Sequence, residues 1–391
     1  MKTKTLLTQA SDYLIYVTDK PDIIITKGNN MYLWDIEGNK YLDFIGGWGV
    51  TSLGHCHPII KKALKKQSRK LITASPSFYN EEQIKFAKLL IDNSCMDKVF
   101  FTSTGAEANE CAIKIARKYG IKHKNGAYEI ITTINSFHGR TLATMSASGK
   151  EQFKNLYEPK VGGFIQVEYN NIEAIKEKIN EKTIAVMIEP IQGEGGIITS
   201  EKDYIKKLRK LCSDNNILLI FDEIQTGIGR TGKLFCYEHY DIEPDIITLA
   251  KGIGGGYPLS ACLSKEKYCV FDAGDQGGTY TGQPLGMAVG YAIVSYIIKK
   301  TICNHVKLIG KYLFKRLKEL EKLKKISNIR GMGLLIAFDV TNLTGQEVFS
   351  LCLKKGLLLN SPKPKTIRLF PSFTIQKKHV DKMISILNDI L

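Results

Sequence analysis

The stretch that decides the fold is Leu218-Leu-Ile-Phe-Asp-Glu-Ile-Gln225, which is followed along the chain by Thr248-Leu-Ala-Lys-Gly-Ile-Gly-Gly-Gly256. In each segment, a run of apolar residues typical of a buried strand ends beside a residue that can carry charge. Asp222 follows the run 217–221, and Lys251 follows the run 246–249. Because α/β folds bind their ligands at the carboxyl ends of the strands, we expect both side chains to project from the same sheet edge.

A lysine and a carboxylate at one sheet edge can hold pyridoxal 5′-phosphate. The Lys251 amine would form a Schiff base with the cofactor's aldehyde, and the Asp222 carboxylate would keep the cofactor's ring nitrogen protonated. A protonated ring accepts electrons from a carbanion, which is the chemistry that this cofactor serves. A lysine after a strand is common on its own, so the surrounding residues must decide.

Strands and helices alternate through the middle of the chain, which indicates an α/β protein with a largely parallel sheet covered on both faces. The expected strands here are 99–101, 128–132, 164–168, 184–188, 217–221, 246–249 and 260–264, and the expected helices are 107–119, 172–179 and 202–215. Further on, residues 331–338 are expected to form one strand. A chain of 391 residues is too long for a single compact core, so we expect two domains, or a large domain with a smaller one packed on it.

Composition narrows the classes of function. The 55 basic and 39 acidic residues give a net charge of +16, but the lysines are spread along the chain without interleaved aromatic residues. This pattern argues against a nucleic-acid partner and favours small anionic substrates. The nine cysteines include no Cys-x-x-Cys pair, which is typical of reduced thiols in the cytoplasm.

Neither a metal site nor a membrane segment is expected. The neighbours His55-Cys56-His57 cannot readily converge on one tetrahedral ion, so a turn before Pro58 is the better interpretation. The amino terminus has no signal-peptide core, and the longest apolar stretch, Met287–Ile298, is too short to span a bilayer. The sequence therefore predicts a soluble, cytoplasmic protein without a membrane partner.

Two nucleotide-binding motifs are matched only in part. Gly227-Ile-Gly-Arg-Thr-Gly232 has the spacing of a dinucleotide fingerprint, but a bulky aromatic segment follows where a helix of small residues is needed. The same residues with Lys233 fit the start of a P-loop, but Leu234 replaces the hydroxyl residue that would bind magnesium. A glycine-rich turn that covers the cofactor's carboxylate partner is the better interpretation.

A phosphate-binding turn is predicted earlier in the chain. Thr102-Ser-Thr-Gly-Ala-Glu-Ala-Asn109 follows a strand and opens an amphipathic helix, so its free backbone N–H groups and the helix dipole can bind an anion. Phe137-His-Gly-Arg140 lies in a loop after the next strand. There the aromatic ring can stack on a flat cofactor, and the arginine can clamp a carboxylate in bidentate fashion.

Together these segments resemble one family in order and spacing. The chain is similar to the class III pyridoxal-phosphate-dependent aminotransferases of fold type I, closest to their acetylornithine and ornithine aminotransferase branch. The most specific matches are Ser103-Thr-Gly-Ala-Glu-Ala-Asn109, Ser136-Phe-His-Gly-Arg-Thr141, Glu189-Pro-Ile-Gln-Gly-Glu-Gly-Gly196, Phe221-Asp-Glu-Ile-Gln-Thr-Gly-Ile-Gly-Arg-Thr-Gly232 and Leu249-Ala-Lys-Gly252. The resemblance covers nearly the whole length.

The resemblance implies cofactor-binding roles for particular residues. Lys251 matches the lysine that binds the cofactor covalently and moves the proton, and Asp222 matches the partner of the ring nitrogen. Gln225 matches a residue near the ring oxygen, and Gly105 and Ala106 match amides that bind the phosphate.

The resemblance also implies an assembly and a domain arrangement. Phe137 matches the residue stacked on the ring, and Thr279 matches a threonine that reaches the phosphate of the neighbouring subunit. A homodimer with shared active sites follows from that match. Residues 51–285 would form a large domain with a mostly parallel central sheet, and residues 1–50 and 286–391 would form a smaller α+β domain.

The substrates implied are an ω-amino donor and 2-oxoglutarate. Arg140 matches the clamp for the substrate carboxylate far from the reacting amine, and Arg368 with Glu194 matches an arginine–glutamate pair that switches between the two substrates. Glu194 would neutralise Arg368 for the donor and swing away for the acceptor. The expected reaction is a ping-pong transfer from N-acetylornithine, which gives N-acetylglutamate semialdehyde and glutamate in arginine biosynthesis.

Two departures from the family pattern concern the donor. Gly278 stands where the branch usually carries Ser or Thr beside the phosphate threonine, and Trp48 lies where the family lines the donor's approach. These changes leave N-succinylornithine, ornithine and 4-aminobutyrate open as donors beside N-acetylornithine. A protein that binds the cofactor without transferring amino groups is an alternative from another class.

Overall fold

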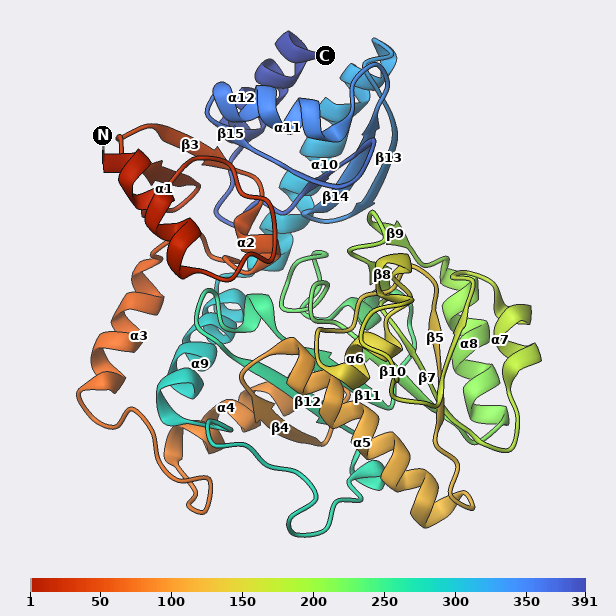
Figure 1. Cartoon of the computed structure of the whole chain (residues 1–391). Coiled ribbons are helices and arrows are strands. Elements are labelled where there is room, and N and C mark those ends of the chain that lie inside the picture. The colour runs from red at the N-terminus through yellow and green to blue at the C-terminus, as the bar shows by residue number, and fades with distance from the viewer. Residues whose placement is uncertain (1) are drawn as a thin grey trace.

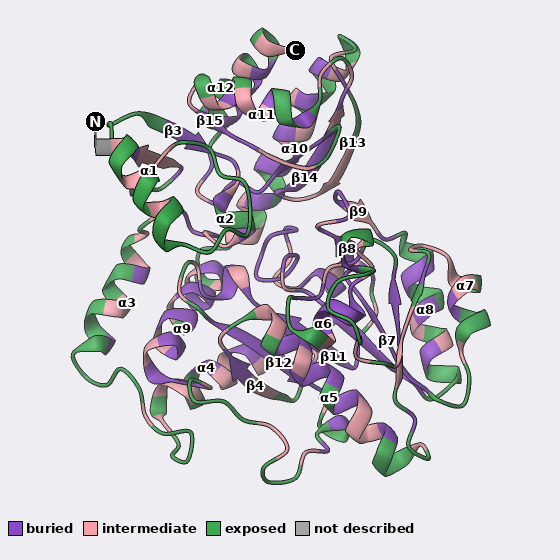
Figure 2. Cartoon of the chain, viewed as in Figure 1, coloured by how far each residue is buried: buried purple, intermediate pink, exposed green. Residues whose placement is uncertain are grey.

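A seven-stranded sheet forms the centre of the molecule (Figure 1). The computed structural model describes residues 2–391. Across the sheet, the strands are Lys98–Thr102 (β4), Ser260–Ser264 (β12), Ile246–Leu249 (β11), Leu218–Asp222 (β10), Thr183–Ile188 (β7), Glu129–Thr133 (β5) and Phe164–Val167 (β6). Only β12 runs antiparallel to its neighbours, so the sheet is largely parallel, and β7, β10, β11 and β12 are buried throughout (Figure 2).

Helices surround this sheet, and most of them pack directly against its strands. They are Pro58–Ser68 (α3), Glu81–Ile91 (α4), Gly105–His123 (α5), Leu142–Ala147 (α6), Ile172–Lys178 (α7), Lys202–Asp214 (α8) and Pro284–Lys299 (α9). In α5, Ala108, Ala112, Ile115 and Ala116 are buried, and the helix lies against β11 and β12. This arrangement brings the start of α5 to the carboxyl edge of the sheet.

The two ends of the chain meet in the remaining part of the structure, at the top of Figure 1. One small sheet is Ile25–Asn29 (β1), Tyr32–Asp35 (β2), Lys40–Asp43 (β3) and Leu357–Leu358 (β15), and the other is Ile326–Met332 (β13), Leu335–Val340 (β14), Thr366–Leu369 (β17) and Asn360–Lys363 (β16). Their helices are Lys2–Tyr13 (α1), Gly46–Gly49 (α2), Ile302–Lys322 (α10), Gly345–Lys354 (α11) and Lys377–Ile390 (α12). Because β15 pairs in parallel with β3, segments from opposite ends of the chain share one sheet.

Several expectations about local structure were wrong. The single strand expected at 331–338 is the hairpin of β13 and β14, which turns at Gly333, a residue with a φ of +61°. Helix α5 begins at Gly105 rather than at 107, because Thr104 and Glu107 form a capping box. The helices α1 and α6, and a two-stranded hairpin of Ile191–Gln192 (β8) and Ile198–Thr199 (β9), were not expected.

No single helix in residues 2–391 combines the length and apolar composition required to cross a bilayer. Helices α9 and α10 meet such a test only as a pair, and they are bent by 69° relative to each other.

Candidate active site

A cavity of about 610 Å³ lies at the carboxyl edge of the central sheet. It falls within the range of ligand pockets, about 300–1,000 Å³. Its lining comes from segments that are far apart in the sequence, among them the start of α5, the loop after β5, the segment after β7, the end of β10 and the end of β11. The lining includes Gly105, Ala106, Phe137, His138, Arg140, Glu189, Glu194, Asp222, Gln225 and Lys251.

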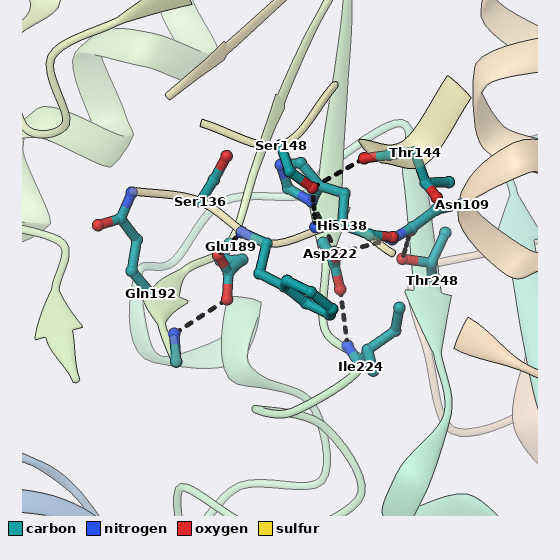
Figure 3. Close-up of polar contacts among 12 residues, drawn as sticks. Asn109, Ser136, His138, Thr144, Ser148, Glu189, Gln192, Asp222, Ile224 and Thr248 are labelled. Atoms are coloured by element: carbon teal, nitrogen blue, oxygen red, sulfur yellow. Dashed lines mark hydrogen bonds and ion pairs between the residues drawn. The ribbon is translucent and has the colours of Figure 1, made fainter. Parts of the chain in front are cut away.

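The carboxylate of Asp222 is held by three donors at the end of β10. His138 Nδ1 and Asn109 Nδ2 each lie 2.8 Å from Asp222 Oδ2, and the Ile224 backbone N–H donates to Oδ1 at 3.1 Å (Figure 3). Asn109 is oriented in turn by the Thr248 hydroxyl, which donates to its Oδ1 at 2.6 Å. A carboxylate fixed in this way keeps one orientation toward the cavity.

Lys251 reaches the cavity from the turn after β11. Its backbone has a φ of +48°, in the left-handed region that side chains other than glycine rarely adopt, so the turn sets the direction of its side chain. Burial lowers the pKa of the Lys251 amine below its ordinary value, although the nearby Glu194 carboxylate opposes this effect. A larger share of neutral amine at physiological pH suits a nucleophile and proton carrier.

An ion pair forms another part of the site. Glu194 Oε1 lies 2.7 Å from Arg368 Nη1, and the Arg368 side chain also donates to Asn360 Oδ1 at 2.9 Å and to the Gly193 carbonyl at 2.8 Å. Burial by itself would raise the pKa of Glu194, but attraction by Arg368 and Lys150 outweighs it and lowers the pKa to about 2. Glu194 is therefore a carboxylate at every physiological pH.

A second buried acid supports the loops of the site. The Glu189 carboxylate accepts hydrogen bonds from the backbone N–H groups of Phe137 and Gly193, each at 2.9 Å (Figure 3 shows Glu189 beside Asp222). Burial raises the pKa of this carboxyl, against the opposing attraction of His138. Glu189 thus connects the loop after β5 to the segment that carries Glu194.

The amino terminus of α5 offers an anion site. As first-turn residues of the helix, Gly105 and Ala106 have backbone N–H groups without an intrahelical acceptor. A Cβ on Gly105 would lie 2.8 Å from Ile224 Cδ1, so the absence of a side chain keeps this approach open. The arrangement combines an amine, a carboxylate and an anion cradle in one cavity.

Comparison with known proteins identifies the family to which the chain belongs. The family model for class-III aminotransferases matches residues 15–391. The chain belongs to the class III aminotransferases. It is 44% identical over 388 residues to an acetylornithine aminotransferase of Caldanaerobacter subterraneus subsp. tengcongensis, covering 99% of both chains.

Solved structures of other aminotransferases have the same fold. An ornithine aminotransferase from Toxoplasma gondii ME49 superposes with a TM-score of 0.95 at 30% identity, covering 99% of this chain and 95% of that one. An acetylornithine aminotransferase from Elizabethkingia anophelis gives a TM-score of 0.88 at 29% identity, covering 99% and 98%. The fold type I architecture expected from the sequence is confirmed.

Class III aminotransferases depend on pyridoxal 5′-phosphate, and the cavity fits this group. Within residues 2–391 the Lys251 side chain has no hydrogen-bond or ion-pair partner, so its amine is available to an aldehyde. The cradle at Gly105 and Ala106 suits a phosphate, and Asp222 suits a ring nitrogen. The buried Gln225 Oε1 also lacks a hydrogen-bond partner, which leaves room for a polar ligand beside it.

The structure brings most of the expected aminotransferase site together. Phe137, Arg140 and Gln225 line the cavity with Lys251 and Asp222, and Arg368 reaches it through Glu194. Besides Arg368, three expected residues do not line the cavity of this chain: Trp48, Gly278 and Thr279.

Those three residues lie on exposed segments. The Trp48 side chain is 57% exposed, and only its backbone carbonyl approaches the site, 3.5 Å from Gln225 Nε2. Gly278 and Thr279 lie in the exposed loop before α9. The roles of Trp48 and Gly278 in donor binding, and of Thr279 in phosphate binding, remain predictions.

Sequence reasoning missed three residues of this site. His138 and Asn109 sit inside the quoted motifs Ser136–Thr141 and Ser103–Asn109 without an assigned role, and Lys150 was not considered. A polar residue at an apolar position of α5 was the available signal for Asn109. No local signal pointed to the contact between His138 and Asp222, because it joins the loop after β5 to the end of β10.

Proposed function

We propose that this protein transfers the terminal amino group of N-acetylornithine to 2-oxoglutarate, as a homodimer in the cytoplasm, within arginine biosynthesis. The observation that carries the proposal is that Glu194, which lines the same cavity as Lys251, is paired with Arg368 at 2.7 Å. The names of relatives that are 44% identical over nearly the full length support N-acetylornithine as the donor.

The cofactor would be held by residues from separate elements. Lys251 would bind it covalently, Asp222 would bind its ring nitrogen, and the amides of Gly105 and Ala106 would bind its phosphate. Phe137 would pack on the ring. When bound, pyridoxal 5′-phosphate supplies an electron sink for the charge that develops when the donor carbon loses its proton.

The chain's own side chains would carry the proton and the substrates. The lowered pKa of Lys251 increases the share of neutral amine, which can accept the proton that the donor carbon loses and donate it again. Arg140 has no carboxylate partner within residues 2–391 and lines the cavity, so it is available to a substrate's distal carboxylate. Glu194 covers Arg368 while the donor, which has no carboxylate beside its reacting amine, is bound.

For 2-oxoglutarate, which carries a carboxylate beside its reacting carbon, Glu194 would leave Arg368 free. A permanently exposed arginine would favour the acceptor and leave an unpaired buried charge with the donor. The pair thus explains how one pocket accepts two substrates of different charge.

Homodimer formation would complete the site. Large apolar residues are exposed on the α3–α4 connection, on α4 and α9, and beside Thr279: Leu71, Ile72, Phe78, Tyr79, Ile84, Tyr280 and Tyr291. A patch of this kind is typical of a subunit interface. We infer that Thr279 reaches the partner's phosphate site across it, and that 51–285 forms the large domain while 1–50 and 286–391 form the small one.

The test is a panel of donors measured as kcat/KM with 2-oxoglutarate as acceptor. N-acetylornithine should give the highest value, above N-succinylornithine, ornithine and 4-aminobutyrate. Ornithine is the second candidate, because an ornithine aminotransferase superposes with a TM-score of 0.95. Transfer from none of them, by protein that carries the cofactor, would leave a binding protein without aminotransferase activity.

Lys251→Ala is the matched inactive control, because the substitution deletes the covalent attachment and the proton carrier together. It should abolish turnover with every donor while thermal unfolding of the cofactor-free protein stays cooperative. Near-normal kcat in this variant would contradict the proposed roles of Lys251.

A further inference from the structure

The carboxylate of Glu194 lies between two cations of different character. Oε1 contacts Arg368 at 2.7 Å, and Oε2 contacts Lys150 Nζ at 3.2 Å. Arg368 is 1% exposed and is fixed by Asn360 and by the Gly193 carbonyl. Glu194 is the only hydrogen-bond acceptor of Lys150 within residues 2–391, and the Lys150 side chain is 23% exposed.

The backbone beside Lys150 is fixed by hydrogen bonds and by close packing. The Gly149 N–H donates to Ser136 Oγ at 3.0 Å, and its carbonyl accepts from the Asn135 N–H at 2.8 Å. A Cβ on Gly149 would lie 2.2 Å from the Thr133 carbonyl oxygen, so only glycine permits this close approach. The approach places the root of the Lys150 side chain beside the end of β5.

Two aromatic rings lie near the ammonium group of Lys150. Lys150 Nζ lies 5.4 Å from the centroid of Phe137 and 5.8 Å from that of Phe153. The guanidinium of Arg140 lies 5.9 Å and 5.1 Å from the same two rings. The Lys150 ammonium can therefore make favourable contacts with these rings from more than one position. The Arg368 guanidinium, in contrast, is held in one position by its hydrogen bonds.

The proposed function requires Glu194 to leave Arg368 when the acceptor's carboxylate arrives. Removing one partner of a buried ion pair is unfavourable when it leaves the other charge uncompensated. The contact with Lys150 avoids that penalty, because Glu194 keeps one cation while it releases the other.

We propose that Lys150 is a positioning residue that holds Glu194 away from Arg368 while a dicarboxylate acceptor is bound. This inference rests on the proposed function and adds a residue to it. Without Lys150, Glu194 stays on Arg368, and the acceptor must displace it without compensation. The donor half-reaction requires Glu194 to stay on Arg368 in any case. Removing Lys150 should therefore lower kcat/KM less for the donor than for the acceptor.

The test compares the two half-reactions in the cofactor-loaded enzyme carrying Lys150→Gln. We expect kcat/KM for 2-oxoglutarate to fall about three- to tenfold relative to kcat/KM for the donor. Binding of glutarate, a dicarboxylate that cannot react, should weaken by a similar factor in calorimetry. Lys154→Gln is the matched control, because it removes a neighbouring charge that is paired with Glu151 and not with Glu194.

A double variant shows whether Lys150 acts through Glu194. In a Glu194→Gln background, Lys150→Gln should produce no further change in the acceptor-to-donor ratio, because the carboxylate it positions is gone. Lys150→Arg, which keeps the charge, should keep the wild-type ratio.

Three results would overturn the proposal. Equal losses for donor and acceptor would mean that Lys150 contacts substrate carboxylates or supports the loop, and an unchanged ratio would mean that it has no role. Persistence of the effect in the Glu194→Gln background would also exclude action through Glu194. If the wild-type enzyme transfers no amino group at all, the proposed function fails instead, and glutarate binding alone then decides the role of Lys150.

Discussion

His138 Nδ1 lies 2.8 Å from Asp222 Oδ2, and the two residues are 1% and 3% exposed. Asn109 donates to the same oxygen at 2.8 Å, and its amide also reaches the His138 carbonyl at 2.6 Å. Buried polar groups that satisfy one another in this way form a rigid network, and removing one member deprives the others of a hydrogen-bond partner. The strand that ends at Asp222 therefore presents a carboxylate whose orientation is set by a distant loop and by helix α5.

Replacing Asp222 by Asn should lower kcat by about 10²- to 10⁴-fold, because a neutral amide cannot keep the cofactor's ring nitrogen protonated. His138→Leu removes one donor but leaves the carboxylate, so its effect on kcat should be clearly smaller. Steady-state kcat of both variants, with cofactor content measured by absorbance, checks this order. A larger loss in His138→Leu than in Asp222→Asn would refute it.

Replacing Arg140 by Met should reduce kcat/KM for N-acetylornithine by about 30- to 5,000-fold, which corresponds to a loss of about 2–5 kcal/mol of binding in the transition state. Arg140→Lys should recover only part of this loss, because an ammonium lacks the planar fork that binds a carboxylate with two hydrogen bonds. A diamine donor without a carboxylate serves as the control. If kcat/KM falls as much for the diamine as for N-acetylornithine, Arg140 does not bind the carboxylate.

Mixing Thr279→Ala subunits with inactive Lys251→Ala subunits tests whether Thr279 acts across the dimer. If it does, each heterodimer contains one site with both defects and one with neither. Activity should then rise toward that of a single wild-type site, measured after subunit exchange has been verified by mass spectrometry. No recovery would mean that Thr279 serves its own chain or has no part in catalysis.

Trp48→Ile should change the ranking of N-acetylornithine, ornithine and 4-aminobutyrate, because we expect shape at Trp48 to select the donor. Gly278→Ser restores a hydroxyl, but its effect should be on the order of 1 kcal/mol or less. The donor panel, measured as kcat/KM, checks both variants. An unchanged ranking in Trp48→Ile together with a large effect of Gly278→Ser would contradict this account.

Gly120→Ala should destabilise the fold by about 1–3 kcal/mol through overpacking. A Cβ at Gly120 would lie 1.8 Å from the Ala127 carbonyl oxygen, where the end of α5 turns into β5. Gly162→Ala is the matched control, since a Cβ there meets nothing within 4 Å. The free energy of unfolding from urea titrations should fall only for Gly120→Ala, and equal values for the two variants would contradict the packing argument.

The sequence by itself determined the strands of the central sheet, the sheet edge and the chemistry attached to it. A buried parallel strand is a continuous apolar run, so the ends of β10 and β11, and with them Asp222 and Lys251, could be located from local pattern alone. The resemblance added Arg140, Glu194 and Arg368. Each of these residues could be assigned a role because the sequence motif that identifies it spans only a few neighbouring positions.

Only the tertiary structure decided which side chains meet. His138, Asn109 and Asp222 come from a loop, a helix and a strand end, and Lys150 reaches Glu194 across 44 positions of sequence. Such contacts leave no periodic signal in the sequence, because their partners are far apart along the chain and meet only when it folds. The same reason accounts for the hairpin at Gly333 and for the shared sheet of β3 and β15, since pairing between strands is fixed by the neighbour that each strand finds in the folded chain.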